Sequence, residues 1–160
     1  MQKSQLIDVP TKKILARIKE HPGIRYRELL RLTGLSSRKV SFHLRELKKS
    51  KLVGAKKLGY NTTRYYPIAV GSAESDILDY IQDSTRRKII LFLLEHSDCR
   101  FREIVRYVGK AQSTTSHHLQ RLEHAGIISV VRVNRKNQFY RLKNKPRIIK
   151  IMSKYKMMEQ

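Results

Sequence analysis

The sequence is poor in several features, and each shortage excludes a class of protein. It has a single cysteine, Cys99, among 160 residues. One thiol excludes a disulfide framework and a multi-cysteine zinc site. The longest purely apolar run, residues 89–94, is far too short to cross a bilayer. The first residues also lack the basic, apolar and small-residue succession of a secretory signal, so we expect a cytoplasmic protein.

Acidic residues are scarce as well. There are 13 Asp and Glu against 35 Lys and Arg, which gives a formal net charge of +22. Residues 1–71 hold 17 basic and 4 acidic residues, and residues 72–160 hold 18 and 9, so the excess is not confined to one tail. Such an excess costs self-repulsion and usually reflects a polyanionic partner. Nucleic acid and an acidic lipid surface are the two candidates.

The chain contains an internal repeat. Residues 13–65 match residues 88–140 without a gap when the sequence is shifted by 75 positions. The identical pairs include Glu20/Glu95, His21/His96, Arg25/Arg100, Glu28/Glu103, Gly34/Gly109, Ser41/Ser116, His43/His118, Leu44/Leu119, Leu47/Leu122 and Tyr65/Tyr140. We conclude that the chain is a tandem duplication.

Apolar spacing, Gly and Pro predict three helices and a β-hairpin in each copy. In the first copy we expect helices over 11–20, 26–32 and 37–50, and strands over 53–58 and 62–66. In the second we expect an extra helix over 76–82, core helices ending near 95, over 101–107 and over 112–124, strands over 128–133 and 138–142, and a last helix over 146–158. The domains are then 1–68, a linker at 69–75, 76–145, and a C-terminal basic amphipathic helix in 146–160. The fold class is mainly α with small β-hairpins (α+β).

This pattern carries a family resemblance. Two helices, a glycine turn, a third helix with S-x-H-L-x-x-L and a following hairpin resemble the winged helix-turn-helix. The runs DSTRRKIILFLL and STTSHHLQRLEHAGII are similar to the ArsR-type repressors of the ArsR/MarR superfamily, and SFHLRELKKSKLV is a looser match. The tandem arrangement resembles that of several archaeal regulators. The resemblance implies a DNA-binding transcriptional regulator whose partner is double-stranded DNA.

In each third helix the leucines mark the inward side, and the opposite side is left for the major groove. The expected base-contacting residues are Ser37, Arg38, Ser41, Phe42 and Arg45 in the first copy, and Gln112, Ser113, Ser116, His117 and Gln120 in the second. The hairpins would serve as wings that contact the backbone or minor groove through Lys56, Lys57, Arg64, Arg132, Arg135 and Lys136. Because the first face is charged and the second is polar, we hypothesise that the second copy discriminates bases while the first attracts phosphates.

Cofactor and catalytic roles find little support in the sequence. Cys99 stands alone, and His117 and His124 lie about 10 Å apart along one helix, so we expect no metal and no other cofactor. The sequence has no phosphate-cradling glycine loop and no H-E-x-x-H, so we expect no enzyme. His43 and His118 sit beside an inward leucine, which favours a structural role.

Alternatives to a sequence-specific regulator remain. The net charge also suits an architectural, nucleoid-associated protein that coats DNA. The C-terminal helix suits a membrane-surface or protein-interaction module, although we expect no membrane partner. The chain is then either a monomeric pseudo-dimer or a homodimer through the C-terminal helix, unless that helix packs on its own unit.

Overall fold

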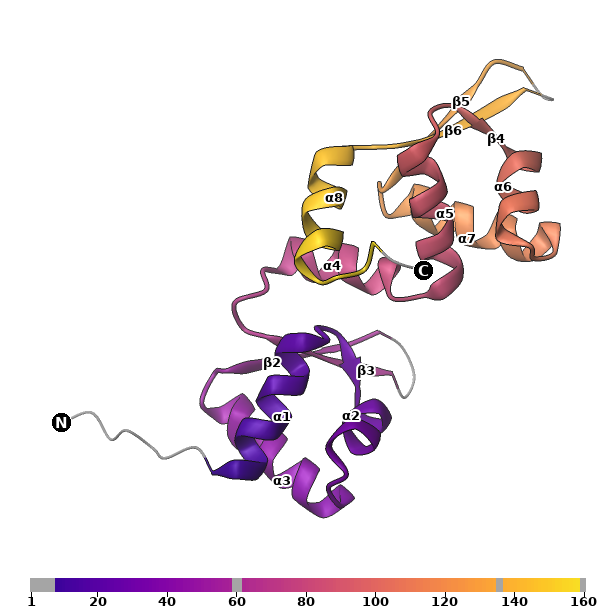
Figure 1. Ribbon diagram of the computed structural model, residues 1–160. Helices are drawn as coiled ribbons and strands as arrows, with labels where there is room; N and C mark the ends of the chain where they lie inside the picture. Colours follow the sequence, from indigo (N-terminus) through magenta and orange to yellow (C-terminus); the bar gives the residue numbers. More distant parts are fainter. Residues whose placement is uncertain (1–7, 59–61, 135–136, 159–160) are drawn as a thin grey trace. The chain divides into compact units, whose positions relative to one another are not determined.

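The computed structural model describes residues 8–58, 62–134 and 137–158 (Figure 1). It divides into two compact units, Met1–Ser75 and Asp76–Gln160. Each unit is built from helices and a small antiparallel sheet, as the fold class α+β requires. The two units repeat the same plan, which agrees with the sequence repeat.

Unit one contains three helices and three strands in the described residues. Its elements are α1 (Val9–Glu20), β1 (Ile24–Arg25), α2 (Tyr26–Thr33), α3 (Ser37–Lys49), β2 (Val53–Lys57) and β3 (Thr63–Pro67). The sheet has the order β1-β3-β2 and is antiparallel throughout. Strand β1 is missing from the predicted elements, because two residues are too short to show an alternating pattern. It pairs Ile24 with Tyr65.

Capping residues mark the ends of the helices in unit one. Asp8 accepts a hydrogen bond from the backbone N–H of Thr11 and caps α1. Ser36 caps α3 in the same way, and α2 ends at Gly34 in the left-handed conformation with φ 65°. The inward faces form one core, which includes Ile14, Ile18, Leu29, Val40, Leu44, Leu47 and Val53. This core fixes α3 against the rest of the unit.

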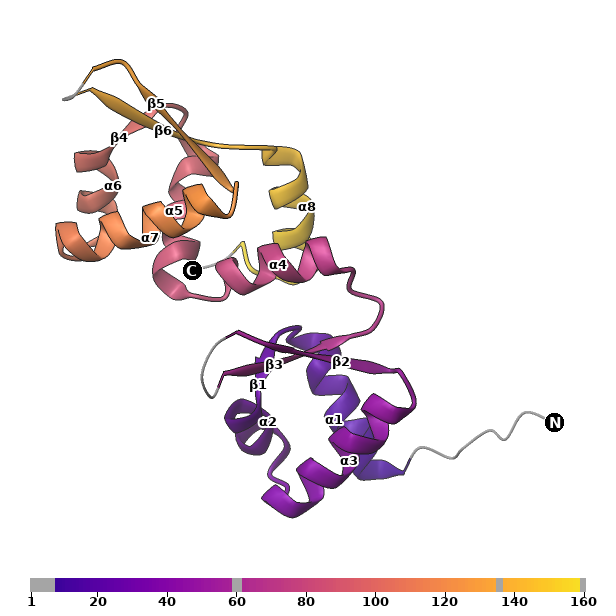
Figure 2. The same cartoon turned by 180° about the vertical axis from the view of Figure 1, so that it is seen from behind.

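Unit two repeats the plan and adds a helix at each end. Its elements are α4 (Ser72–Ile81, which crosses the unit boundary), α5 (Ser84–Glu95), β4 (Cys99–Arg100), α6 (Phe101–Val108), α7 (Gln112–His124), β5 (Ile128–Arg132), β6 (Gln138–Leu142) and α8 (Lys145–Lys154). The sheet order is β4-β6-β5. Figure 2 shows the β5–β6 hairpin extending beyond the helices of this unit.

Two helix boundaries lie four residues from those predicted. Helix α4 begins at Ser72, inside the stretch 69–75 predicted as a linker. The carbonyl of Gly71 accepts hydrogen bonds from two backbone N–H groups, and the Ser75 hydroxyl donates to the Ser72 carbonyl. Small polar residues therefore form the first turn here, although their composition is also typical of a loop. Helix α8 ends at Lys154, before the predicted residue 158.

The apolar side of α8 is covered within its own unit. Ile148, Ile151 and Met152 are 2%, 5% and 0% exposed. At the start of the helix, Lys145 Nζ donates to the Leu94 carbonyl near the end of α5 at 3.2 Å. Of the two roles considered for the C-terminal helix, packing on its own unit accounts for its apolar residues.

Candidate nucleic-acid interface

Helix α3 presents one polar side to solvent. Its inward residues Val40, Leu44 and Leu47 are at most 3% exposed. All five predicted base-contacting residues lie on the exposed side: Ser37, Arg38, Ser41, Phe42 and Arg45. Phe42 is 50% exposed, and the Arg45 guanidinium lies 5.8 Å from its ring centroid. The exposed side of the helix therefore holds two arginines and one aromatic ring.

Helix α7 presents a polar but uncharged side at the same positions. Leu119 and Leu122 are buried. The predicted contact residues Gln112, Ser113, His117 and Gln120 are exposed, and Ser116 is half-buried. Gln side chains can make bidentate contacts to adenine, and Ser and His can make single contacts to base edges.

Tyr26 in α2 connects to the contact face of α3, a link that the sequence analysis missed. Its hydroxyl donates to the Ser37 carbonyl at 2.9 Å and lies 2.9 Å from Ser37 Oγ and 2.7 Å from Ser41 Oγ. The repeat places Phe101 at the corresponding position of unit two. Phenylalanine cannot make these bonds, so the same face of α7 is not held in this way. The alignment of Tyr26 with Phe101 could have revealed this difference between the units, because the two side chains differ by one hydroxyl.

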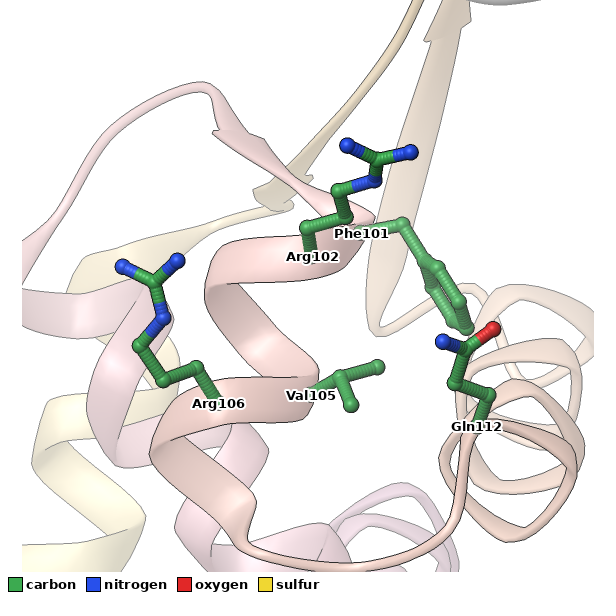
Figure 3. Close-up of a pocket in the computed structure, with 5 residues that line it drawn as sticks. All are labelled: Phe101, Arg102, Val105, Arg106 and Gln112. Carbon is green, nitrogen blue, oxygen red and sulfur yellow. The ribbon is translucent and has the colours of Figure 1, made fainter.

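A shallow hollow of about 250 Å³ opens between α6 and α7. Phe101, Val105 and Gln112 line it together with Arg102 and Arg106. Figure 3 shows the Gln112 amide beside the Phe101 ring, while the two guanidinium groups extend from α6. The hollow thus combines an apolar wall, one amide and two cations.

Each of the two predicted contact helices, α3 and α7, also carries a histidine that faces the first core helix of its unit. His43 Nδ1 lies 2.8 Å from the Thr11 hydroxyl and 3.7 Å from the capping carboxylate of Asp8. His118 Nδ1 lies 3.8 Å from Asp83, which caps α5. Asp8 and Asp83 are themselves 75 positions apart, so the repeat extends beyond residues 13–65 and 88–140. These contacts fit the structural role expected of both histidines.

His118 differs from His43 in its partners. The repeat places Arg86 where unit one has Thr11, and the buried His118 Nδ1 has no hydrogen-bond partner in the described part of the chain. Burial lowers the pKa of His118 below its ordinary value of 6.5, and this effect exceeds the opposing attraction of Asp83. His118 is therefore held as a neutral ring at neutral pH.

The predicted wing residues differ in exposure. Lys57 is exposed and Lys56 is half-buried on β2. Arg64 is only 6% exposed, and its guanidinium donates to the Gly23 carbonyl at 2.9 Å. Its assignment to the wing surface is wrong, because the alternation of β3 turns Arg64 inward together with Tyr66. Arg135 and Lys136 lie outside the described residues.

Arg132, the remaining wing residue, is held by α7. Its Nη2 lies 3.2 Å from Oε1 of Glu123. The repeat places Lys48 and Lys57 at the corresponding positions of unit one. Neither lysine has an acidic partner among the residues that the structure describes. Unit one therefore presents two positive charges where unit two presents a neutralised pair.

Among residues 8–58, 62–134 and 137–158, no group of three or more His, Cys, Asp or Glu could hold a metal ion. Cys99 is buried in the slot that Ile24 fills in unit one, and burial raises the pKa of its thiol. Within the same residues, no helix has both the length and the apolar character needed to span a membrane.

A glycine turn between two helices, an exposed third helix and a hairpin wing, present twice, define a tandem winged helix-turn-helix protein. Comparison with known families agrees. Residues 83–130 match the family described as bacterial regulatory protein, arsR family, and residues 7–53 match winged helix-turn-helix DNA-binding. The two units are thus winged helix-turn-helix units, and the second is similar to the arsR family.

Individual proteins also resemble the chain. An HTH-type transcriptional regulator of Methanocaldococcus jannaschii is 29% identical over 123 residues, which cover 77% of this chain and 31% of that protein. The chain thus spans about a third of the length of this relative. Among solved structures, the transcriptional repressor BigR from Xylella fastidiosa superimposes with a TM-score of 0.46 and 24% identity, covering 54% of this chain and 86% of the repressor.

Proposed function

We propose that the chain is a sequence-specific transcriptional regulator that places α3 and α7 in the major groove of double-stranded DNA. In this proposal unit two discriminates bases, and unit one mainly attracts phosphates. The observation that carries it is the contrast between two corresponding helix faces. The α7 face is polar and uncharged, whereas the α3 face holds two arginines.

Hydrogen-bonding capacity supports the assignment of base reading to α7. Gln112, Ser116 and Gln120 have no side-chain hydrogen bond within the described residues, so their donors and acceptors are available to base edges. A free amide can pair with adenine through two hydrogen bonds, and such a pair contributes about 1–3 kcal/mol of discrimination. Uncharged side chains would add little to a protein that only coats DNA.

Charge supports the anchoring role of unit one. Arg38, Arg45, Lys48 and Lys57 are exposed on α3 and the adjacent wing strand. Cations at such positions contact phosphates, which contribute affinity but carry no sequence information. If ~6–10 phosphates are neutralised, affinity falls by roughly 10³–10⁵ between low and moderate salt.

The chain would bind as a monomeric pseudo-dimer, because each unit supplies one contact helix and one wing. We propose domains at 1–68 and 76–145, followed by a C-terminal segment whose helix α8 stabilises unit two. Pairing of two chains through α8 would have to use its exposed side, since Ile148, Ile151 and Met152 are covered. We propose no enzymatic activity.

One observation favours a second function. The formal net charge of +22 is large for a chain of 160 residues. Charge alone supports architectural binding with little base selection. In that case both contact helices would lie on the backbone, and their replacement would weaken all DNA sequences equally.

Two double variants test the division of labour. The variant Gln112→Ala/Gln120→Ala should relax sequence preference and leave binding to random DNA unchanged. The variant Arg38→Ala/Arg45→Ala should weaken every sequence by a similar factor. Lys143→Ala/Lys150→Ala removes two exposed charges at the end of unit two and controls for net charge. Equal losses on selected and random DNA in both contact-helix variants would refute the division of labour.

A further inference from the structure

The two units differ in how firmly the contact helix is bonded to the helix before it. Tyr26 and Phe101 are the first residues of α2 and α6, and they occupy corresponding repeat positions. They differ only by the phenolic hydroxyl. That hydroxyl makes all the contacts between Tyr26 and the seryl side chains of α3 that were described above.

In unit one the Tyr26 hydroxyl engages the seryl hydroxyls of two predicted base-contacting residues. Tyr26 donates its single proton to the Ser37 carbonyl. Its oxygen can then only accept, so Ser37 and Ser41 must direct their protons to it. Both serines would have to give up a hydrogen bond before donating to a base.

In unit two the corresponding groups are not engaged. Phe101 has no hydroxyl, and the Ser116 hydroxyl has no hydrogen-bond partner in the described part of the chain. The space beside the Phe101 ring is the hollow between α6 and α7. Figure 3 places the amide of the exposed Gln112 at the edge of this hollow.

We propose that the residue at this position decides which unit discriminates bases. Phe101 is a positioning residue that leaves Ser116 and Gln112 free to read the major groove. Tyr26 is its counterpart, which commits Ser37 and Ser41 to bonds inside the protein. This inference rests on the proposed function, since it assumes that α7 lies in the groove of DNA.

Exchange of the hydroxyl tests the inference directly. Phe101→Tyr places a hydroxyl toward Ser116 and the Gln112 carbonyl, the counterparts of the Tyr26 partners. We expect it to lower the affinity ratio between a selected site and its single-base variants by about fivefold, the effect of one hydrogen bond. Affinity for random DNA should not change. Tyr65→Phe, which removes the hydroxyl of a half-buried residue that makes no side-chain hydrogen bond to α3 in the described part of the chain, is the matched control for Tyr26→Phe.

A pair of serine variants gives a second readout that does not depend on how the new tyrosine packs. Ser116→Ala should lower the affinity ratio, and Ser41→Ala should not. In the Tyr26→Phe background, Ser41→Ala should begin to affect base preference, because the serine is then free. Thermal unfolding of each variant verifies that the fold is retained.

The outcomes separate this inference from the proposed function. If the wild-type chain selects no DNA sequence, the proposed function fails before any variant is compared. If the wild type selects a site and Phe101→Tyr keeps the same affinity ratio, the inference is overturned and the proposed function stands. Equal effects of Ser41→Ala and Ser116→Ala in the wild-type background would overturn it as well.

Discussion

Glu123 on α7 and Arg132 on the wing strand β5 form an ion pair, with 3.2 Å between Oε1 and Nη2. The same two positions in unit one hold Lys48 and Lys57. One pair neutralises the junction between contact helix and wing, and the other leaves it doubly positive. The duplicated units have therefore diverged in electrostatics while keeping one fold.

Glu123→Gln should tighten binding to DNA of any sequence. The change removes a negative charge from the proposed DNA-binding side and frees Arg132 to contact a phosphate. The salt dependence of DNA affinity should therefore steepen by about one counterion. Binding titrations at several salt concentrations measure this slope. Glu20→Gln makes the same charge change in the Arg17–Glu20 pair of α1. A slope that changes equally in both variants would show that only net charge matters.

Asp83→Ala should destabilise unit two. The carboxylate accepts a hydrogen bond from the backbone N–H of Arg86 at 2.9 Å and caps α5. Loss of such a cap costs about 1 kcal/mol in the free energy of unfolding. Urea denaturation measures the loss. Asp83→Asn keeps an oxygen acceptor and should retain most of the stability, and an equal loss in both variants would assign the effect to charge instead.

His118 should make the stability of unit two depend on pH. Burial lowers the pKa of His118 in the folded chain. As pH falls through about 6.5, the unfolded chain takes up the proton more readily than the folded one, and stability decreases. Above the pKa of the unfolded state His118 is neutral in both states, and it then takes nothing from the free energy of unfolding. Thermal unfolding between about pH 7.5 and 5.5 should therefore show a smaller decline for His118→Gln than for the wild type.

His124→Gln is the control for this experiment, because its ring is exposed on the same helix and, within the described residues, hydrogen-bonds only to the Gln120 carbonyl. It should follow the wild-type decline. A His118→Gln curve parallel to the wild type would show that other groups cause the pH dependence.

Much of the fold follows from the sequence, because apolar spacing marks the inward side of each helix. Helix α7 spans the predicted residues 112–124. The face opposite Leu119 and Leu122 is exposed or half-buried as predicted. Capping residues and glycines placed most other boundaries within a few residues. These signals are local, so a linear reading detects them.

The parts that were missed depend on contacts between distant segments. From the sequence Arg64 is expected to be a surface cation. In the structure β1 pairs with β3, and the Arg64 guanidinium donates to the Gly23 carbonyl. The bond from Tyr26 to Ser41 joins two helices, and aligned Tyr and Phe look interchangeable. Base contacts form only when DNA is bound, so the contact residues predicted on α3 and α7 stay predictions.

The central claim is that this basic chain selects a DNA sequence through α7. The most direct measurement is the ratio of affinities for a site selected from random DNA and for a scrambled site, at physiological salt. A regulator of this kind is expected to show a ratio on the order of 10³ or more, which should fall in the Gln112→Ala/Gln120→Ala variant. A ratio below about tenfold, unchanged in that variant, would contradict the claim and favour a protein that coats DNA.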